Sequence, residues 1–115
     1  MGDFRELFAW QEAKRLIQLS RDAITSLPHF ERYALGAQWR RAAHSVALNI
    51  AEGAAQPTSA QFRRYLRIAI GSLDELQAVF EVAEALGYMT RDQLHDLRRC
   101  RTHCARLTVT LARRI

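Results

Sequence analysis

The chain has 115 residues, 49% of them apolar, and a formal net charge of +5. This length predicts one domain over residues 1–115, and the apolar share excludes an intrinsically disordered chain. There is no long apolar run, no signal-peptide pattern and no cysteine framework, which excludes membrane-spanning and disulfide-rich secreted classes. We therefore expect a cytoplasmic protein with no membrane partner.

Helical periodicity runs through most of the chain and is interrupted at three places. The interruptions are Pro28 with its neighbours, residues 53–58 and residues 87–90. Proline and glycine at these places end helices or form turns. We therefore expect four helices, over residues 4–26, 31–55, 58–86 and 90–114.

Three residues support these boundaries and the order of the helices. Thr58 and Thr90 each precede a glutamine three residues later, which is the pattern of a capping box, and Gly87 fits a helix C-terminus. Each helix carries an apolar stripe, and the connections are short. An all-α fold follows, an antiparallel up-down-up-down four-helix bundle.

The helix expected over residues 58–86 carries a second line of residues beside its core stripe. The line consists of Ile68, Ser72, Glu75, Val79, Val82 and Leu86. One bundle core needs only one stripe, so the second line predicts a subunit interface and a homo-oligomer. The alternative is a wide core stripe on a central helix.

Arginine dominates the basic residues, since sixteen of the seventeen are arginine and Lys14 is the only lysine. Codon bias in a GC-rich genome is one explanation. The other is a need for flat guanidinium groups in ion-pair networks or at phosphates. Within a helix only Arg15 and Arg99 have an acid three or four residues away, at Glu12 and Asp96.

Antiparallel folding predicts further ion pairs between neighbouring helices. Residues that lie equally far before and after a turn are at the same height along the bundle axis. The acid and arginine pairs found in this way are Glu52 with Arg63, Glu75 with Arg40 or Arg41, and Glu81 with Arg98 or Arg99. Arginines without an evident acid are candidates for a polyanion surface: Arg64, Arg67, Arg101, Arg106, Arg113 and Arg114. Arginine binds phosphate bidentately and releases counterions, so RNA or DNA is the expected partner, bound with strong salt dependence.

No catalytic or metal-binding constellation is predicted. Cys100, His103 and Cys104 lie within about one helical turn, but both cysteines fall on the core stripe, where a free thiol acts as a small hydrophobe. Ser72 and Glu75 mimic a nucleophile and a base, but such a pair at a helix interface more often fixes register. We therefore expect no enzyme, no metal and no cofactor.

Residues 31–53, ERYALGAQWRRAAHSVALNIAEG, resemble the signature of the 23S rRNA intervening-sequence family of small bacterial four-helix-bundle proteins. The resemblance continues through Trp10-Gln11 and through residues 70–76, IGSLDEL. It implies a bundle that assembles as a ring-shaped homopentamer without established activity. Some members are encoded inside intervening sequences of large-subunit rRNA genes. Many members carry proline where this chain has Ala47, so we expect its helix to lack a kink there.

The same resemblance extends distantly to the accessory variability determinant of diversity-generating retroelements, a basic pentameric barrel that binds nucleic acid and a reverse transcriptase. It implies a nucleic-acid-associated scaffold, with a protein partner as a further expectation. The motif residues are expected to make structural polar contacts at helix interfaces: Arg40, Arg41, Asn49, Glu52, Ser72 and Glu75. The alternative function is a self-assembling protein-interaction bundle whose arginines are used in salt bridges.

Overall fold

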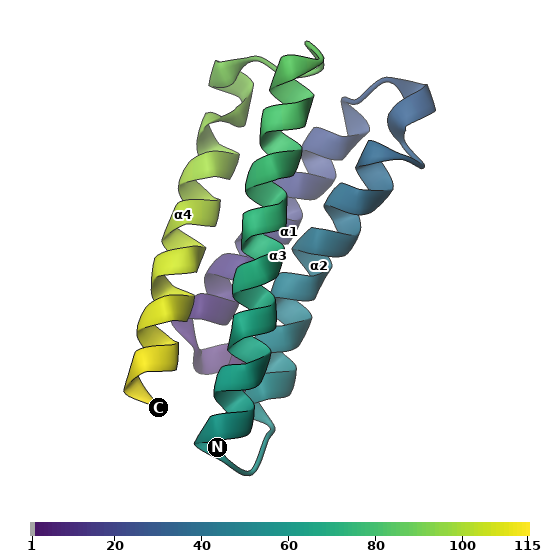
Figure 1. Cartoon of the computed structure of the whole chain (residues 1–115). Helices are drawn as coiled ribbons and strands as arrows, with labels where there is room; N and C mark the ends of the chain where they lie inside the picture. Colours follow the sequence, from purple (N-terminus) through teal and green to yellow (C-terminus); the bar gives the residue numbers. More distant parts are fainter. Residues whose placement is uncertain (1) are drawn as a thin grey trace.

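The computed structural model describes residues 2–115, and its long elements are four α-helices (Figure 1). They are α1 (Phe8–Thr25), α2 (Leu35–Ala54), α3 (Ser59–Ala85) and α4 (Arg91–Arg114). Helix α1 packs against α2 and α4, and α3 packs against the same two helices. The predicted all-α, antiparallel up-down-up-down bundle is confirmed.

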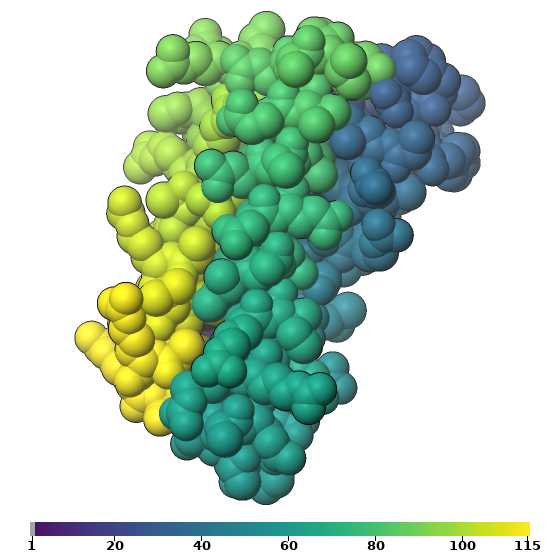
Figure 2. Space-filling view, in the orientation of Figure 1, coloured from purple at the N-terminus to yellow at the C-terminus, as the bar shows by residue number. Residues whose placement is uncertain are grey.

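The bundle is a rod of 44 × 24 × 19 Å. Helix α3, with 27 residues, spans almost all of that length, since 1.5 Å per residue gives about 40 Å. In Figure 2 this helix forms the front of the molecule, with α4 on its left and α2 on its right. Within residues 2–115 no helix combines the length and the apolarity that crossing a membrane requires.

The first helix begins later than predicted. Residues Phe4–Glu6 form a short 3-10 helix (η1), capped by the carboxylate of Asp3, and Leu7 then adopts an extended backbone (φ −71°, ψ 128°) before α1 starts. The ring of Phe4 packs edge-on against Trp10 with 5.1 Å between centroids. This contact folds the N-terminal segment back onto α1 instead of extending the helix.

The second helix also begins later than its predicted start at residue 31. Residues His29–Glu31 form a second 3-10 helix (η2), and Ala34 leaves helical geometry (φ −112°, ψ −96°) before α2 begins. Helix α2 then continues unbroken through Ala47, in agreement with the expected absence of a kink.

The capping box predicted at Thr90 is confirmed, because its hydroxyl accepts from the Gln93 backbone N–H (3.1 Å) and the Gln93 side chain accepts from the Thr90 backbone N–H (2.8 Å). At Thr58 only half of the box forms. Its hydroxyl accepts from the Gln61 backbone N–H (3.2 Å), but the Gln61 carboxamide oxygen accepts from that hydroxyl (3.3 Å) rather than from the backbone.

Gly87 ends α3 as predicted, with the positive φ of 74° that glycine tolerates. The Gly87 N–H bonds to the carbonyl of Glu84 and the Tyr88 N–H to the carbonyl of Ala83, both at 3.0 Å. These two bonds form a Schellman motif, which satisfies carbonyls at the helix end.

Trp39 and Phe80 are the largest fully buried side chains, and their rings meet edge-on with 5.4 Å between centroids. The Trp39 indole N–H donates to the hydroxyl of Ser20 (3.0 Å), and the core therefore contains a satisfied polar pair. On the inner side of α1, Leu16 is fully buried while Ile17 is only half-buried. Other fully buried side chains include Ile50, Leu66, Leu73, Leu76 and Leu94.

Gly53 lies where α2 passes close to α3. A Cβ atom there would lie 2.9 Å from Cδ1 of Phe62 and 2.9 Å from Cβ of Tyr65. Because the Tyr65 Cβ is fixed to the α3 backbone, it cannot rotate away. Only glycine therefore fits this close approach.

We expect Gly53→Ala to lower the free energy of unfolding by up to about 2 kcal/mol, because overpacking costs about 1–3 kcal/mol and is offset only in part by a helix-propensity gain of about 1 kcal/mol. Gly71→Ala is the matched control, since nothing lies within 4 Å of a Cβ there and the helix should gain up to about 1 kcal/mol. Urea unfolding at one protein concentration measures both. A Gly53→Ala variant as stable as Gly71→Ala would contradict this packing.

Candidate functional site

A polar cluster joins α2 to α3 on the outer side of the bundle. The Ser72 hydroxyl donates to the hydroxyl oxygen of Ser45 (2.8 Å), and the Asn49 amide donates to the Ser45 carbonyl (2.8 Å) and to its hydroxyl (3.0 Å). All three residues are half-buried. Ser72 thus bonds across the α2–α3 interface, to Ser45, which was not among the predicted residues, whereas Asn49 bonds to Ser45 within α2.

The charged members of the predicted motif do not join this cluster. Arg40, Arg41, Glu52 and Glu75 are exposed, and none of them makes an ion pair within residues 2–115. The ion pairs predicted for Glu52 with Arg63, and for Glu75 with Arg40 or Arg41, are therefore wrong.

The pair of Glu52 with Arg63 fails because the two side chains leave their helices on different faces. Arg63 turns toward α4 and donates to the main-chain oxygen of Ile115 (2.9 Å). Glu52 lies on the exposed face of α2. Counting about a turn predicts the level of a residue along the axis but does not predict its direction around the helix.

The predicted pair between Glu81 and Arg98 is confirmed. The Arg98 guanidinium donates to Glu84 at 2.6 Å and to Glu81 at 3.0 Å, which ties α4 to α3. These carboxylates, Glu84 foremost, raise the pKa of Arg98 above its ordinary value. Arg99, the alternative partner, is exposed and makes no ion pair with any residue in the range 2–115.

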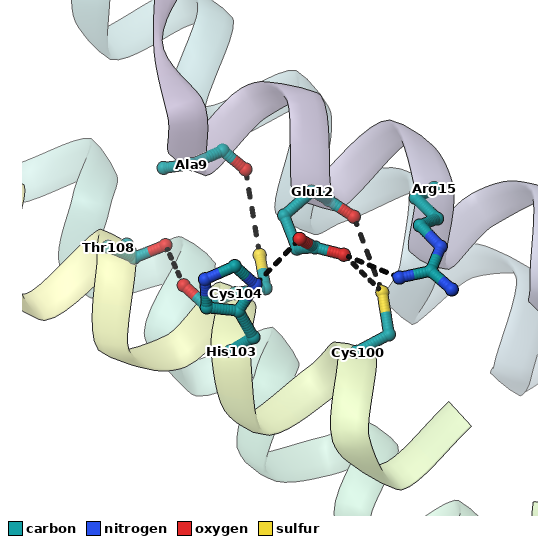
Figure 3. A network of polar contacts seen from close by, with 7 residues as sticks. All are labelled: Ala9, Glu12, Arg15, Cys100, His103, Cys104 and Thr108. Atoms are coloured by element: carbon teal, nitrogen blue, oxygen red, sulfur yellow. Dashed lines mark hydrogen bonds and ion pairs between the residues drawn. The ribbon is translucent and has the colours of Figure 1, made fainter. Parts of the chain in front are cut away.

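Helices α1 and α4 are joined by a network around Glu12 (Figure 3). One carboxylate oxygen accepts from the Cys100 thiol (3.1 Å) and lies 3.6 Å from Arg15, and the other lies 2.7 Å from Nδ1 of His103. The Glu12 side chain is only 13% exposed. Desolvation opposes its ionisation, but the hydrogen bonds from Cys100 and His103 outweigh that effect and hold the pKa of Glu12 below its ordinary value.

Both thiols are buried in the α1–α4 seam. The Cys104 thiol donates to the carbonyl of Ala9 (3.6 Å), and burial raises the pKa of Cys104 to about 12. Burial and the neighbouring Glu12 also raise the pKa of Cys100 above its ordinary value. Thiolate is the nucleophilic form of cysteine, so both side chains behave as apolar packing groups near neutral pH, as expected from their place on the core stripe.

The six arginines predicted to form a polyanion surface lie on two helices. Arg64 and Arg67 are exposed on α3, and Arg106, Arg113 and Arg114 are exposed on α4. The sixth differs, because Arg101 is half-buried and donates weakly to the Leu73 carbonyl and to the Thr102 hydroxyl, both at 3.4 Å.

The structure also shows a basic row along α4 that the sequence analysis did not single out. Arg99, Arg106 and Arg113 follow one another at seven-residue spacing, which places them along one side of the helix. All three are exposed. Arg99 was left out of the candidates because Asp96 stood three residues before it, but these two side chains form no ion pair within residues 2–115.

The second line of α3 is largely a surface feature. Ile68 is 46% exposed, Val82 43% and Leu86 55%, and the neighbouring Leu48 of α2 is 65% exposed. Only Val79 of this line is buried in the core. The alternative of a wide core stripe is therefore wrong for three of the four apolar residues of the line.

These features define a class of protein, a small antiparallel four-helix bundle with an uncovered apolar face and an excess of exposed arginine. The family model described as 23S rRNA-intervening sequence protein matches residues 5–110. The chain therefore belongs to the 23S rRNA-intervening sequence protein family. No curated protein matches it significantly.

Proposed function

We propose that the protein is a non-catalytic, self-assembling helical bundle whose basic surface binds the phosphate backbone of RNA or DNA. The observation that carries this proposal is the excess of unpaired guanidinium. Within residues 2–115 four of the sixteen arginines pair with a carboxylate: Arg5, Arg15, Arg21 and Arg98. The remaining positive charge suits a polyanion, because binding releases the counterions condensed on its phosphates.

The uncovered apolar face supports self-assembly. Leu48, Ile68, Val82 and Leu86 expose apolar surface on neighbouring helices of the rod. Arg41 of α2 and Glu75 of α3 are also exposed, and a second copy can pair these opposite charges. We propose assembly through this face, as the homopentamer that the family resemblance implies.

A protein-interaction bundle that binds no nucleic acid is the second candidate function. The apolar face favours it, since exposed apolar patches mark contacts with proteins. Salt-dependent retention of RNA separates the two functions.

Sedimentation of the protein alone and with a labelled RNA duplex tests both parts of the proposal. We expect an assembly of about 66 kDa, five times the chain mass of 13.2 kDa. We also expect RNA affinity to fall by roughly 10³-fold or more between 50 and 200 mM salt, as several phosphate contacts require. A species of 13.2 kDa at micromolar concentration would contradict assembly, and no RNA retention at 50 mM salt would favour the second candidate.

Two double variants control the assembly result. Ile68→Glu with Val82→Glu adds charge to the apolar face and should give monomers. Gln18→Glu with Gln77→Glu adds the same charge at exposed positions elsewhere and should leave the assembly intact. Assembly that survives the first pair would place the interface on another face.

A further inference from the structure

A groove of about 630 Å³ opens along the seam between α1 and α4. It is lined by four arginines and a histidine against two carboxylates. The lining residues that matter here are Arg15, Arg98, Arg99, His103, Arg106 and Asp96. Cationic side chains thus outnumber anionic ones in a concave surface formed by two helices.

Some of these charges are already used inside the bundle. Arg98 is bound by two α3 carboxylates. Both carboxylate oxygens of Glu12 are engaged, one by Cys100 and one by His103, so this acid has little capacity left for a further cation. Asp96 makes no ion pair within residues 2–115 and is the remaining acid of the groove.

Two unpaired guanidiniums and one weakly paired guanidinium remain for a ligand. Arg99 and Arg106 are exposed and make no hydrogen bond or ion pair with side chains of residues 2–115. Arg15, on the α1 wall, touches Glu12 only at 3.6 Å and keeps 61% of its side chain exposed. Against the carboxylates of Glu12 and Asp96 these three arginines leave a local surplus of positive charge.

The spacing of the α4 arginines suits a repeating anion. Arg99 and Arg106 are seven residues apart, about 10.5 Å along the helix axis. Each strand of B-DNA carries one phosphate per about 3.4 Å of helix axis, so a stretch of duplex as long as this separation presents several phosphates that two guanidiniums can bind. Thr102, on the same side of α4 and also in the groove, offers a hydroxyl between them.

The network of Figure 3 positions the histidine of the groove. The Glu12 carboxylate holds Nδ1 of His103 at 2.7 Å, which fixes the imidazole and leaves Nε2 as the free ring nitrogen. The same carboxylate joins the two walls, since Glu12 belongs to α1 and His103 to α4. The groove is therefore held in shape before any ligand arrives.

We propose that the α1–α4 groove is the phosphate-binding centre of the nucleic-acid interface, with Arg99 and Arg106 binding phosphates of one strand and Arg15 forming the facing wall. The proposal rests on the proposed function and assigns it to a place in the fold. It moves the centre of the interface from Arg64 and Arg67 of α3 to the side of α4 that carries Arg99 and Arg106.

The test compares three double variants in binding to an RNA duplex across a salt series. Arg99→Gln with Arg106→Gln should reduce the slope of log K against log salt by about 1.8 and weaken binding roughly 50-fold at 0.1 M salt, because each phosphate contact contributes about 0.9 to the slope. Arg21→Gln with Arg32→Gln removes the same charge outside the groove and is the matched control. It should change the salt slope and the affinity much less than the groove variant does. Arg64→Gln with Arg67→Gln reports on the competing α3 site.

The outcomes separate this proposal from the function on which it rests. If the wild-type protein binds RNA and only the α3 variant loses affinity, the groove is overturned while nucleic-acid binding stands. If the wild-type protein binds no RNA, the proposed function fails. Titration with tripolyphosphate then tests the groove alone by NMR. Saturable shifts of the His103 ring signals that disappear in the Arg99→Gln, Arg106→Gln variant would support it, and their absence would overturn it.

Discussion

Trp39→Ala is expected to lower the free energy of unfolding by about 3–5 kcal/mol, the usual cost of truncating a buried tryptophan. The indole is fully buried, packs edge-on against Phe80 and donates to Ser20. Truncation leaves a cavity in the middle of the bundle and removes the partner of a buried hydroxyl. Because a domain of this size has a total stability of about 5–15 kcal/mol, this one change removes a large part of it.

Urea unfolding followed by circular dichroism measures the effect. Trp10→Ala is the matched control, because that indole is only half-buried and should lose clearly less stability. Ser20→Ala isolates the hydrogen bond, since it leaves the indole N–H buried without a partner at a cost of about 1–3 kcal/mol. Equal losses for the two tryptophan variants would contradict the central role of Trp39.

Glu12→Gln is expected to lower the free energy of unfolding by about 2–3 kcal/mol at neutral pH. The carboxylate is the shared acceptor of the Cys100 thiol and the His103 ring, and hydrogen bonds to a charged group contribute about 1.5–3 kcal/mol each. A carboxamide of the same shape retains one acceptor but presents an N–H group to one of the two donors. Glu6→Gln, an exposed change, is the control and should have almost no effect.

The pH dependence of this loss has a definite sign. The pKa of Glu12 is lower in the folded protein than its ordinary value of 4.5, so the folded state binds this proton less readily than the unfolded state. The stabilisation is therefore complete above pH 4.5 and is lost as the pH falls through the lower folded pKa. Wild type and Glu12→Gln should converge in stability below about pH 4.5, and a constant difference down to pH 3 would contradict the network.

The fold was predictable because its signals are local. The capping box at Thr90 and the positive-φ glycine at position 87 are each encoded within a few residues, and the structure contains both. The late start of α1 was not predictable from periodicity, because it depends on the contact of Phe4 with Trp10. Phe4 continues the apolar pattern of the helix in the sequence, although it lies before the first residue of α1.

Ion pairs between helices were predicted less well. Counting from a turn gives the height of a residue along the bundle axis, but it does not give the side of the helix from which the side chain points. Glu81 and Arg98 share both and form the expected pair, whereas Glu52 and Arg63 share only a level. The Glu12 network was missed altogether. Its members lie at opposite ends of the chain, and no turn between α1 and α4 fixes their register, so counting about a turn gave no indication of it.

The seam between α1 and α4 has a consequence for kinetics. Glu12 and His103 are 91 residues apart, whereas α2 and α3 are joined by a short turn. Closing a long loop costs more entropy than closing a short one. The contact between α1 and α4 is therefore expected to form after the contacts between helices that follow one another in the chain, and to open before them. Opening would uncover the thiols of Cys100 and Cys104, which are otherwise buried. The rate at which a thiol reagent alkylates these cysteines therefore measures how often α1 separates from α4.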